Sequence, residues 1–375
     1  MNERLYKLAE LGQSVWFDDV NRDAIASGKL DRLIAEYNVT GGTSNPTIFE
    51  KAFSSTNAYD EQFREIARDI SSPEGIQDML ALTDVQLAAD RFRPVYEDTG
   101  GDDGYVSLEV SPTFAHDTEA TIKETRRLFA ALDRPNVMIK IPGTPEGIPA
   151  VETCLAEGIN VNITLLFSVE SYEQVAEAYV RALEQRLAAG RPIDSLASVA
   201  SFFISRVDTM SDERLTALAE QASTPERKAE VLALRGRLGI ANAKLAYQRY
   251  LAITTSERWQ KLEKAGARPQ RCLWASTSTK NPDYSDVLYV AELIGPETVN
   301  TLPEDTLNAF ADHGNVAETL TQGAEEAELL MAQLRDAGLN IAAVTRDLQA
   351  EGVEKFAKSY EDALKAIKDR SQAPA

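Results

Sequence analysis

The sequence has little cysteine, little histidine and no long apolar run, and each shortage argues against a class of protein. Its 375 residues include 2 cysteines and 2 histidines. Two cysteines make no disulfide framework, so we interpret Cys154 and Cys272 as reduced core residues of a cytosolic protein. His116 and His313 are isolated, and there is no clustered Cys/His spacing, so we expect no metal centre. No apolar stretch approaches the ~20 residues that a membrane span needs.

Positive charge is the scarcer sign, and this narrows the range of partners. The chain has 39 Lys and Arg against 59 Asp and Glu, a formal net charge of −20 at pH 7. Nucleic acids and anionic membrane surfaces select basic proteins, so we expect neither as a partner. The first residues lack the pattern of a secretory leader, which also favours a cytoplasmic protein. A small phosphorylated molecule is compatible with this charge if a few basic residues converge in one pocket.

Short apolar strands alternate with amphipathic helices along the chain. Eight strands, each followed by helix, are the count of a closed (β/α)8 barrel, so we predict an α/β fold, a TIM barrel with extra helices. We expect residues 1–375 to form a single domain. The strand candidates are 15–18, 41–43, 105–110, 137–140, 159–164, 196–203, 272–275 and 298–300. The main helical patterns cover 31–37, 46–98, 118–132, 146–156, 169–188, 212–264 and 351–368.

An open doubly wound sheet is the structural alternative. A glycine-rich phosphate turn after the first strand would favour it, and neither GxGxxG nor GxxxxGK occurs in the sequence. The segment Gly100–Gly104, GGDDG, is interpreted as a surface turn before the third strand. The helical stretch at about 210–265 has no role that the sequence identifies, because packing, a lid and a contact surface are all compatible with it.

The segment Asn136–Thr144, NVMIKIPGT, places a lysine at the end of a buried strand. Val137–Ile139 is apolar, Lys140 ends the run, and Pro142 breaks it. Barrel enzymes carry their chemistry at the carboxyl ends of the strands. Desolvation disfavours the charged form of a buried lysine, and the free amine can attack a carbonyl carbon. The plain alternative is a lysine whose ammonium group reaches solvent past the strand end.

Polar residues recur at or near the ends of the first seven strand candidates. Each taken alone has an ordinary explanation as a helix cap, a turn residue or a solvated strand end, and Arg206 could pair with Asp208. Their coincidence favours a site, because a closed barrel would bring them to one mouth. The residues are Asp18, Asn45, Glu109, Lys140, Asn162, Thr164, Ser201, Arg206, Ser276 and Lys280.

Several of these segments resemble the signature segments of transaldolases, in order and at comparable separations. They are GGTSNPT, VSLEV, VMIKIPGT, NVNITLLFS and SFFISRVD. The later WASTSTKNP and ANAKLAYQRY resemble the longer bacterial form of that family. The resemblance covers roughly residues 10 to 365. It implies a (β/α)8 barrel that uses no cofactor and no metal.

The resemblance implies transfer of a dihydroxyacetone unit from sedoheptulose 7-phosphate to glyceraldehyde 3-phosphate, giving erythrose 4-phosphate and fructose 6-phosphate in the pentose phosphate pathway. Lys140 matches the family's Schiff-base lysine and Asp18 its general acid/base. Glu109 and Thr164 match the pair that holds the catalytic water. The matches for substrate binding are Asn45, Asn162 and Ser201 at the hydroxyls, Phe203 in the pocket wall and Arg206 at the phosphate.

The sequence departs from the family after the seventh strand, where many members have a second phosphate-binding arginine. Ser276–Pro282 reads STSTKNP and contains no arginine. We expect Lys280 to take this role and Ser276 to contact substrate beside it. Lysine is a point charge and lacks the bidentate fork of arginine, so phosphate affinity or orientation would differ.

Two other functions and the oligomeric state stay open at this point. A class I aldolase of the same family would release dihydroxyacetone, but such members are shorter and typically use a tyrosine near the lysine. The Glu109–Thr164 pair favours transfer. A barrel that binds sugar phosphates without catalysis is the third possibility, and the retention of Lys140, Glu109 and Asp18 argues against it. Both a monomer and a homodimer are compatible with the sequence.

Overall fold

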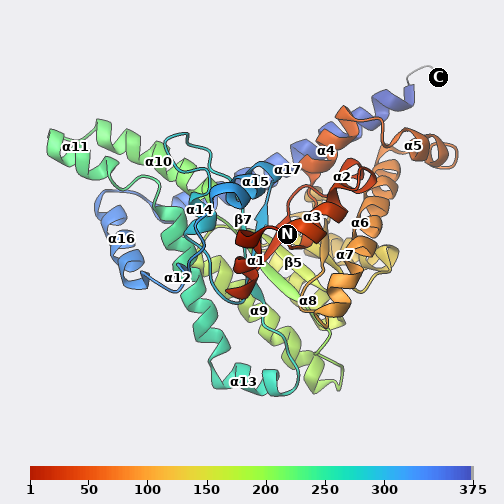
Figure 1. Cartoon of the computed structure of the whole chain (residues 1–375), viewed down its shortest axis with the longest axis horizontal. Helices are drawn as coiled ribbons and strands as arrows, with labels where there is room; N and C mark the ends of the chain where they lie inside the picture. The colour runs from red at the N-terminus through yellow and green to blue at the C-terminus, as the bar shows by residue number, and fades with distance from the viewer. Residues whose placement is uncertain (373–375) are drawn as a thin grey trace.

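The computed structural model describes residues 1–372 and shows a closed barrel of eight parallel strands in sequence order. β8 pairs with β1 and closes the ring. The fold class predicted from the sequence, a TIM barrel with extra helices, is therefore confirmed (Figure 1). The strands are β1 (Gln13–Phe17), β2 (Val39–Thr43), β3 (Val106–Glu109), β4 (Val137–Pro142), β5 (Val161–Leu166), β6 (Ser198–Phe203), β7 (Arg271–Ala275) and β8 (Thr298–Leu302).

Helices surround the strands, with α10, α11, α12 and α16 on one side in Figure 1 and α4 to α8 on the other. Those before β5 are α1 (Glu3–Glu10), α2 (Arg22–Ala26), α3 (Lys29–Tyr37), α4 (Pro46–Ser55), α5 (Asp60–Ile66), α6 (Pro73–Asp98), the 3-10 helix η1 (Pro112–Phe114), α7 (Thr118–Leu132) and α8 (Gly147–Glu157). Those after it are α9 (Val169–Ala188), α10 (Ser205–Glu220), α11 (Pro225–Leu232), α12 (Leu238–Thr254), α13 (Glu257–Lys264), α14 (Leu288–Ala291), α15 (Glu304–His313), α16 (Ala324–Asp336) and α17 (Ile341–Gln372).

The helical stretch after β6 is largely a packing element. α12 packs against α9 and α16, and it buries Tyr247 and Tyr250. Two turns interrupt this stretch between its helices. Thr224 caps α11 ahead of Pro225, and Ser256 caps α13, each through a side-chain oxygen that accepts a backbone N–H. The stretch at about 210–265 therefore contributes a helix of the barrel's outer layer.

Alternate residues of each strand face the barrel interior, as the period of a strand requires. In β1, Val15 and Phe17 pack with the outer helices while Trp16 belongs to the interior cluster. Gly41 in β2 makes room for this, because a Cβ there would lie 2.6 Å from the Trp16 indole nitrogen. This close approach explains why β2, with the sequence VTGGT, carries so weak a strand pattern.

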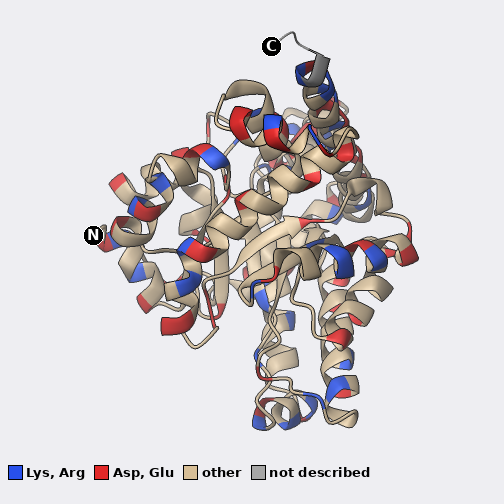
Figure 2. Ribbon diagram, turned by 90° about the vertical axis from the view of Figure 1, so that its right-hand side faces the viewer, with Lys and Arg blue, Asp and Glu red and all other residues tan. Residues whose placement is uncertain are grey.

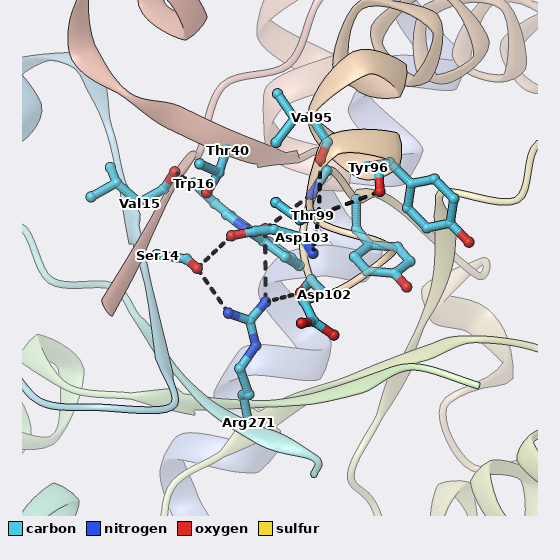
Figure 3. Close-up of polar contacts among 12 residues, drawn as sticks. Ser14, Val15, Trp16, Thr40, Val95, Tyr96, Thr99, Asp102, Asp103 and Arg271 are labelled. Atoms are coloured by element: carbon cyan, nitrogen blue, oxygen red, sulfur yellow. Dashed lines mark hydrogen bonds and ion pairs between the residues drawn. The ribbon is translucent and has the colours of Figure 1, made fainter. Parts of the chain in front are cut away.

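A polar cluster around Asp103 lies at the amino-terminal end of the barrel (Figure 3), beside a cavity of about 550 Å³ that the starts of the strands line. The Asp103 carboxylate accepts hydrogen bonds from Ser14 Oγ and from Trp16 Nε1, the latter at 2.7 Å, and lies 3.7 Å from a guanidinium nitrogen of Arg271. Asp103 is only 6% exposed. The interpretation of GGDDG as a surface turn was therefore wrong at this residue, because two inward-facing strand residues and a strand arginine bind its carboxylate.

The structure corrects one further detail. β4 continues through Ile141 to Pro142, so Lys140 lies within the strand and does not end it. Proline is accepted there because it is the last residue of the strand, where a missing N–H disturbs the ladder least.

α17 crosses the carboxyl-end side of the barrel, from α10 to α4 (Figure 1). Gln349 in this helix donates to two backbone oxygens, that of Gly143 directly after β4 and that of Leu165 near the end of β5. Charged residues are spread over the outer helices, while the central strands are largely free of them (Figure 2). Within residues 1–372, no helix combines the length and the apolarity that crossing a membrane requires.

Candidate active site

A cavity of about 550 Å³ opens at the carboxyl ends of the strands. Nine of the eleven candidate residues from the sequence line this cavity. The other two, Glu109 and Asn162, lie directly behind lining residues, Glu109 behind Lys140 and Asn162 behind Ser201. The structure thus brings the candidate residues of seven strand ends to one place. The nine that line the cavity are Asp18, Asn45, Lys140, Thr164, Ser201, Phe203, Arg206, Ser276 and Lys280.

Lys140 is a buried amine beside a buried carboxylate. The residue is 6% exposed, its Nζ lies 3.7 Å from Glu109 Oε2, and it donates a 3.1 Å hydrogen bond to the backbone oxygen of Ser44. Lys140 and Glu109 are register partners on β4 and β3, so the pairing follows from the strand alignment. The alternative of a lysine reaching bulk solvent is therefore excluded for this conformation.

Glu109 is placed to hold or release a proton next to this amine. Its Oε1 accepts a 3.1 Å hydrogen bond from Thr164 Oγ1, and its Oε2 has no hydrogen-bond partner within residues 1–372. Burial raises the pKa of the Glu109 carboxyl, while Lys140 and Thr164 oppose that rise. A carboxyl with a raised pKa, close to a reactive amine, can serve as both acid and base.

Asp18 lies on the cavity wall directly after β1. Its Oδ1 accepts a 2.6 Å hydrogen bond from Thr43 Oγ1, and its backbone N–H donates to Leu302 at the end of β8. These contacts fix the carboxylate from the two strands that flank β1. Asp18 and Lys140 line the same cavity, as acid/base and nucleophile for one substrate would have to do.

Two asparagine side chains at or near the cavity also form hydrogen bonds within the protein. Asn45 caps α4, since its Oδ1 accepts from the Ile48 backbone N–H at 3.0 Å, and it also lines the cavity. Asn162 is fully buried, and its Oδ1 accepts a 2.6 Å hydrogen bond from Ser201 Oγ. Asn45 thus caps a helix, a role that the sequence did not predict, and it still lines the cavity.

Arg206 and Lys280, the two phosphate contacts that the resemblance implies, both line the cavity. The Arg206 guanidinium stands 5.1 Å from the Phe203 ring centre and 6.0 Å from that of Phe356. It does not pair with Asp208, which accepts from the Gly239 N–H at 2.7 Å and from the Tyr289 hydroxyl at 2.9 Å. The arginine therefore lines the cavity, and within residues 1–372 no acidic side chain forms an ion pair with it.

The segment after β7 is held against the start of α10. Ser276 has a φ of 56°, an unusual value for a residue other than glycine, and its hydroxyl lies 3.0 Å from that of Ser205. Lys280 donates a 2.7 Å hydrogen bond to Ser278 Oγ. Burial, followed by the charges of Arg206 and Lys51, lowers the pKa of Lys280. The two predicted phosphate contacts are thus close enough to repel each other.

Sequence reasoning missed several groups of the site. Lys51 and Phe356 line the cavity, Thr43 binds Asp18, and the Ser44 backbone oxygen binds Lys140. The spacing of Thr47, Ile48 and Lys51 on α4 could have indicated the first of these, because such residues share one helix face. No group of three His, Cys, Asp or Glu side chains suited to a metal ion occurs within residues 1–372.

The fold and the site together define a (β/α)8 barrel with a candidate nucleophilic lysine, buried beside a carboxylate at the catalytic end of the strands. A model of the Transaldolase/Fructose-6-phosphate aldolase family matches residues 15–367. The chain belongs to this family.

Similar proteins cover almost the whole chain. The transaldolase 2 of Nostoc sp. is 48% identical over 369 residues, which are 98% of this chain and 97% of that protein. The transaldolase of Thermobifida fusca is 48% identical over 98% of both chains. The transaldolase of Trichodesmium erythraeum is 47% identical over 99% of this chain and 98% of its own length.

Proposed function

We propose that this protein is a transaldolase that carries a dihydroxyacetone unit on Lys140. The donor is sedoheptulose 7-phosphate, the acceptor is glyceraldehyde 3-phosphate, and the products are erythrose 4-phosphate and fructose 6-phosphate. Family membership and the transaldolases that match the full chain support this activity. The observation that carries the residue assignment is the buried Lys140 amine, 3.7 Å from Glu109 and in one cavity with Asp18.

The reaction begins with attack of the neutral Lys140 amine on the ketose carbonyl carbon. A carbinolamine forms, and its hydroxyl leaves as water. A water molecule held by Glu109 and Thr164 moves the protons of this dehydration. The hydrogen bond between those two residues and the raised pKa of the Glu109 carboxyl support this role. The product is an iminium ion between Lys140 and C2 of the sugar.

The iminium ion then accepts the electrons of the C3–C4 bond. Asp18 takes the proton of the C4 hydroxyl, the C3–C4 bond breaks, and the aldose phosphate leaves. The three-carbon enamine stays on Lys140. When the acceptor aldehyde arrives, the enamine carbon attacks it and Asp18 returns its proton to the new C4 oxygen. The dehydration steps run in reverse, and water releases the product ketose from Lys140.

Binding groups hold the enamine and the phosphate during this exchange. Asn45 and Ser201 hold substrate hydroxyls, Asn162 positions the Ser201 hydroxyl through their 2.6 Å hydrogen bond, and Phe203 forms a wall. Arg206, Ser276 and Lys280 bind the phosphate end. Positioning of reactants contributes as much as ~7–11 kcal/mol to such reactions. No tyrosine lines this cavity within residues 1–372, which favours transfer over release of dihydroxyacetone.

We further infer a cytoplasmic enzyme whose residues 1–375 form one domain, acting as a monomer or a homodimer. The absence of a helix able to span a membrane within residues 1–372 is compatible with this placement. The single closed barrel supports one domain.

The activity is tested by following transfer of the dihydroxyacetone unit from fructose 6-phosphate to erythrose 4-phosphate in wild type, Lys140→Met and Asp18→Asn. We expect transfer in wild type, none in Lys140→Met, and a loss of about 10²-fold or more in Asp18→Asn, which lacks the base. Free dihydroxyacetone is measured in the same samples. Its accumulation at the rate of donor consumption would show an aldolase, and normal turnover in Lys140→Met would overturn the covalent mechanism.

A further inference from the structure

The phosphate end of the cavity contains a third cation that neither the family resemblance nor the proposed function assigns. Lys51, Arg206 and Lys280 all line the same cavity. They come from three separate elements: α4, the first turn of α10 and the segment after β7. In a chain with a net charge of −20, such a convergence of positive charge needs an explanation.

Lys51 reaches the cavity because one face of α4 is turned toward it. Thr47, Ile48 and Lys51 line the cavity, and residues three and four apart share a helix face. The helix is fixed at its start by the Asn45 cap and at Thr47, whose hydroxyl lies 2.9 Å from that of Ser359 on α17. The position of Lys51 at the mouth is therefore set by anchored backbone.

Within residues 1–372, no ion pair joins any of the three cations to an acidic side chain, although the charge of Asp18 on the same cavity opposes the lowering of the pKa of Arg206 and Lys280 by burial. Arg206 lies over two aromatic rings, and the Lys280 amine donates to Ser278. Glu304, an acid that lines the same cavity, is bound by Lys29 at 2.8 Å. Burial lowers the pKa of Lys280, and the charges of Arg206 and then Lys51 lower it further, so both cations act on the Lys280 amine.

We propose that Lys51 is a phosphate-binding residue, and that Lys51 and Lys280 together replace the second arginine that the segment after β7 lacks. An arginine fork orients a phosphate by two parallel hydrogen bonds, whereas a lysine supplies one point charge. Two lysines on opposite elements restore the orientation that one lysine cannot give. This inference rests on the proposed function, because it concerns the phosphate of the same substrates.

The test compares Lys51→Met, which keeps the aliphatic stem, with Lys123→Met on α7. Lys123 is an exposed lysine on a helix and lines none of the cavities described for residues 1–372, so the control has the same change of net charge. Binding of inorganic phosphate is measured by calorimetry, and kcat and KM are measured with fructose 6-phosphate and with unphosphorylated fructose as donors. Thermal melting checks that each variant is folded.

We expect Lys51→Met to raise the phosphate Kd and the KM for fructose 6-phosphate about fivefold, with kcat within about twofold. The KM for fructose should not change, Lys123→Met should resemble wild type, and Lys51→Arg should restore most of the affinity. An unchanged phosphate Kd in folded Lys51→Met would overturn the inference. Because calorimetry needs no turnover, this result decides the role of Lys51 even if the chain proves to lack transaldolase activity.

Discussion

The Lys140–Glu109 pair is the residue-scale feature on which the chemistry depends. Both side chains are under 10% exposed, and their separation of 3.7 Å leaves Glu109 Oε2 without a hydrogen bond within residues 1–372. Burying two charges costs several kcal/mol each, and such a pair is weak evidence for stability. The arrangement is better explained as a proton site held next to a nucleophile.

Glu109→Gln tests the proton role directly. An amide cannot exchange protons with the carbinolamine, so we expect dehydration, and with it turnover, to fall by about 10²–10⁴-fold. Because burial raises the pKa of Glu109, wild type should lose its carboxylate at a higher pH than an exposed glutamate does, and this acid limb should vanish in the variant. Rapid-quench kinetics of imine formation across pH measure both effects. An unaltered rate would exclude Glu109 from the step.

Most of the candidate site could be predicted from the sequence, because its residues lie at strand ends. A closed barrel brings the ends of all its strands together, however the helices pack around it. Glu109 with Lys140, and Lys140 with Asn162, are register partners on neighbouring strands. Lys51 was not predicted, since its place at the mouth depends on how α4 packs. Asn162 lies behind Ser201. Strand alternation predicts that a side chain faces the interior but does not predict how far from the cavity it lies.

At the scale of elements, a bulge in β5 positions Thr164. The pairing with β6 shifts register between Ile163 and Leu166, and Leu165 has a φ of 58°. Such a conformation is strained for leucine and persists only where surrounding structure holds it. α17 supplies that support through the Gln349 hydrogen bond and the close approach of Gly352.

Gly352→Ala should disturb this contact. The added Cβ would lie 2.8 Å from Leu165 Cδ2, so we expect a loss of about 1–3 kcal/mol in the free energy of unfolding and a reduced kcat through Thr164. Urea denaturation and transfer assays measure the two effects. In a Leu165→Ala background the glycine substitution should cost much less, and equal costs in both backgrounds would rule out the proposed contact.

Two acids of α10 tie this helix to the segment after β7. Asp208 accepts from Tyr289 and Asp212 from Tyr284, at 2.9 and 2.6 Å. Burial raises the pKa of Asp208 to about 7, although hydrogen bonds from Gly239 and Tyr289 oppose the rise. The pair thereby connects the helix that carries Arg206 with the segment that carries Lys280.

The raised pKa of Asp208 predicts a pH effect on stability. Between the unfolded pKa near 4 and the folded pKa of about 7, the folded protein binds the extra proton, so this group's contribution to stability falls as pH rises. Asp208→Asn does not titrate. We therefore expect the stability of the variant relative to wild type to increase from pH 5 to 8 in urea titrations, and a difference independent of pH would contradict the assignment.

Two helices were predicted to the residue, whereas the terminal helix, predicted over 351–368, begins at Ile341 and most strand limits differ by one or two residues. Thr118–Leu132 and Val169–Ala188 match α7 and α9 because caps mark their starts. A buried parallel strand has no such marks, so β4 was predicted to end at Lys140 and not at Pro142. The burial of Asp103 was not predicted, because a turn-like sequence does not reveal which side chain points into the barrel.

At the scale of the whole molecule, each end of the barrel has a cavity of about 550 Å³. The Asp103–Arg271 pair lies at the amino-terminal end, with side chains 8% and 15% exposed, and the candidate active site lies at the other. The number and order of the strand candidates predicted the barrel from the sequence. The path of α17 across the mouth could not be predicted, because an amphipathic pattern does not say which surface the helix covers.

Asp103→Asn should separate stability from catalysis. It removes the charge opposite Arg271, and breaking a buried pair costs about 3–5 kcal/mol. We expect a clearly lowered Tm while KM and kcat at 25 °C stay near wild type, because the cluster is at the far end of the barrel from Lys140. Asp102→Asn, whose side chain is 75% exposed, is the control and should change stability little. An equal change in Tm for both substitutions would contradict the stabilising role of the Asp103–Arg271 pair.

The central claim, that the dihydroxyacetone unit is carried covalently by Lys140, is tested most directly by borohydride reduction in the presence of fructose 6-phosphate, followed by mass spectrometry of the peptides. The account predicts one reduced three-carbon adduct, located on the peptide containing Lys140 and absent without the sugar. An unmodified Lys140, or an adduct on another lysine, would contradict it.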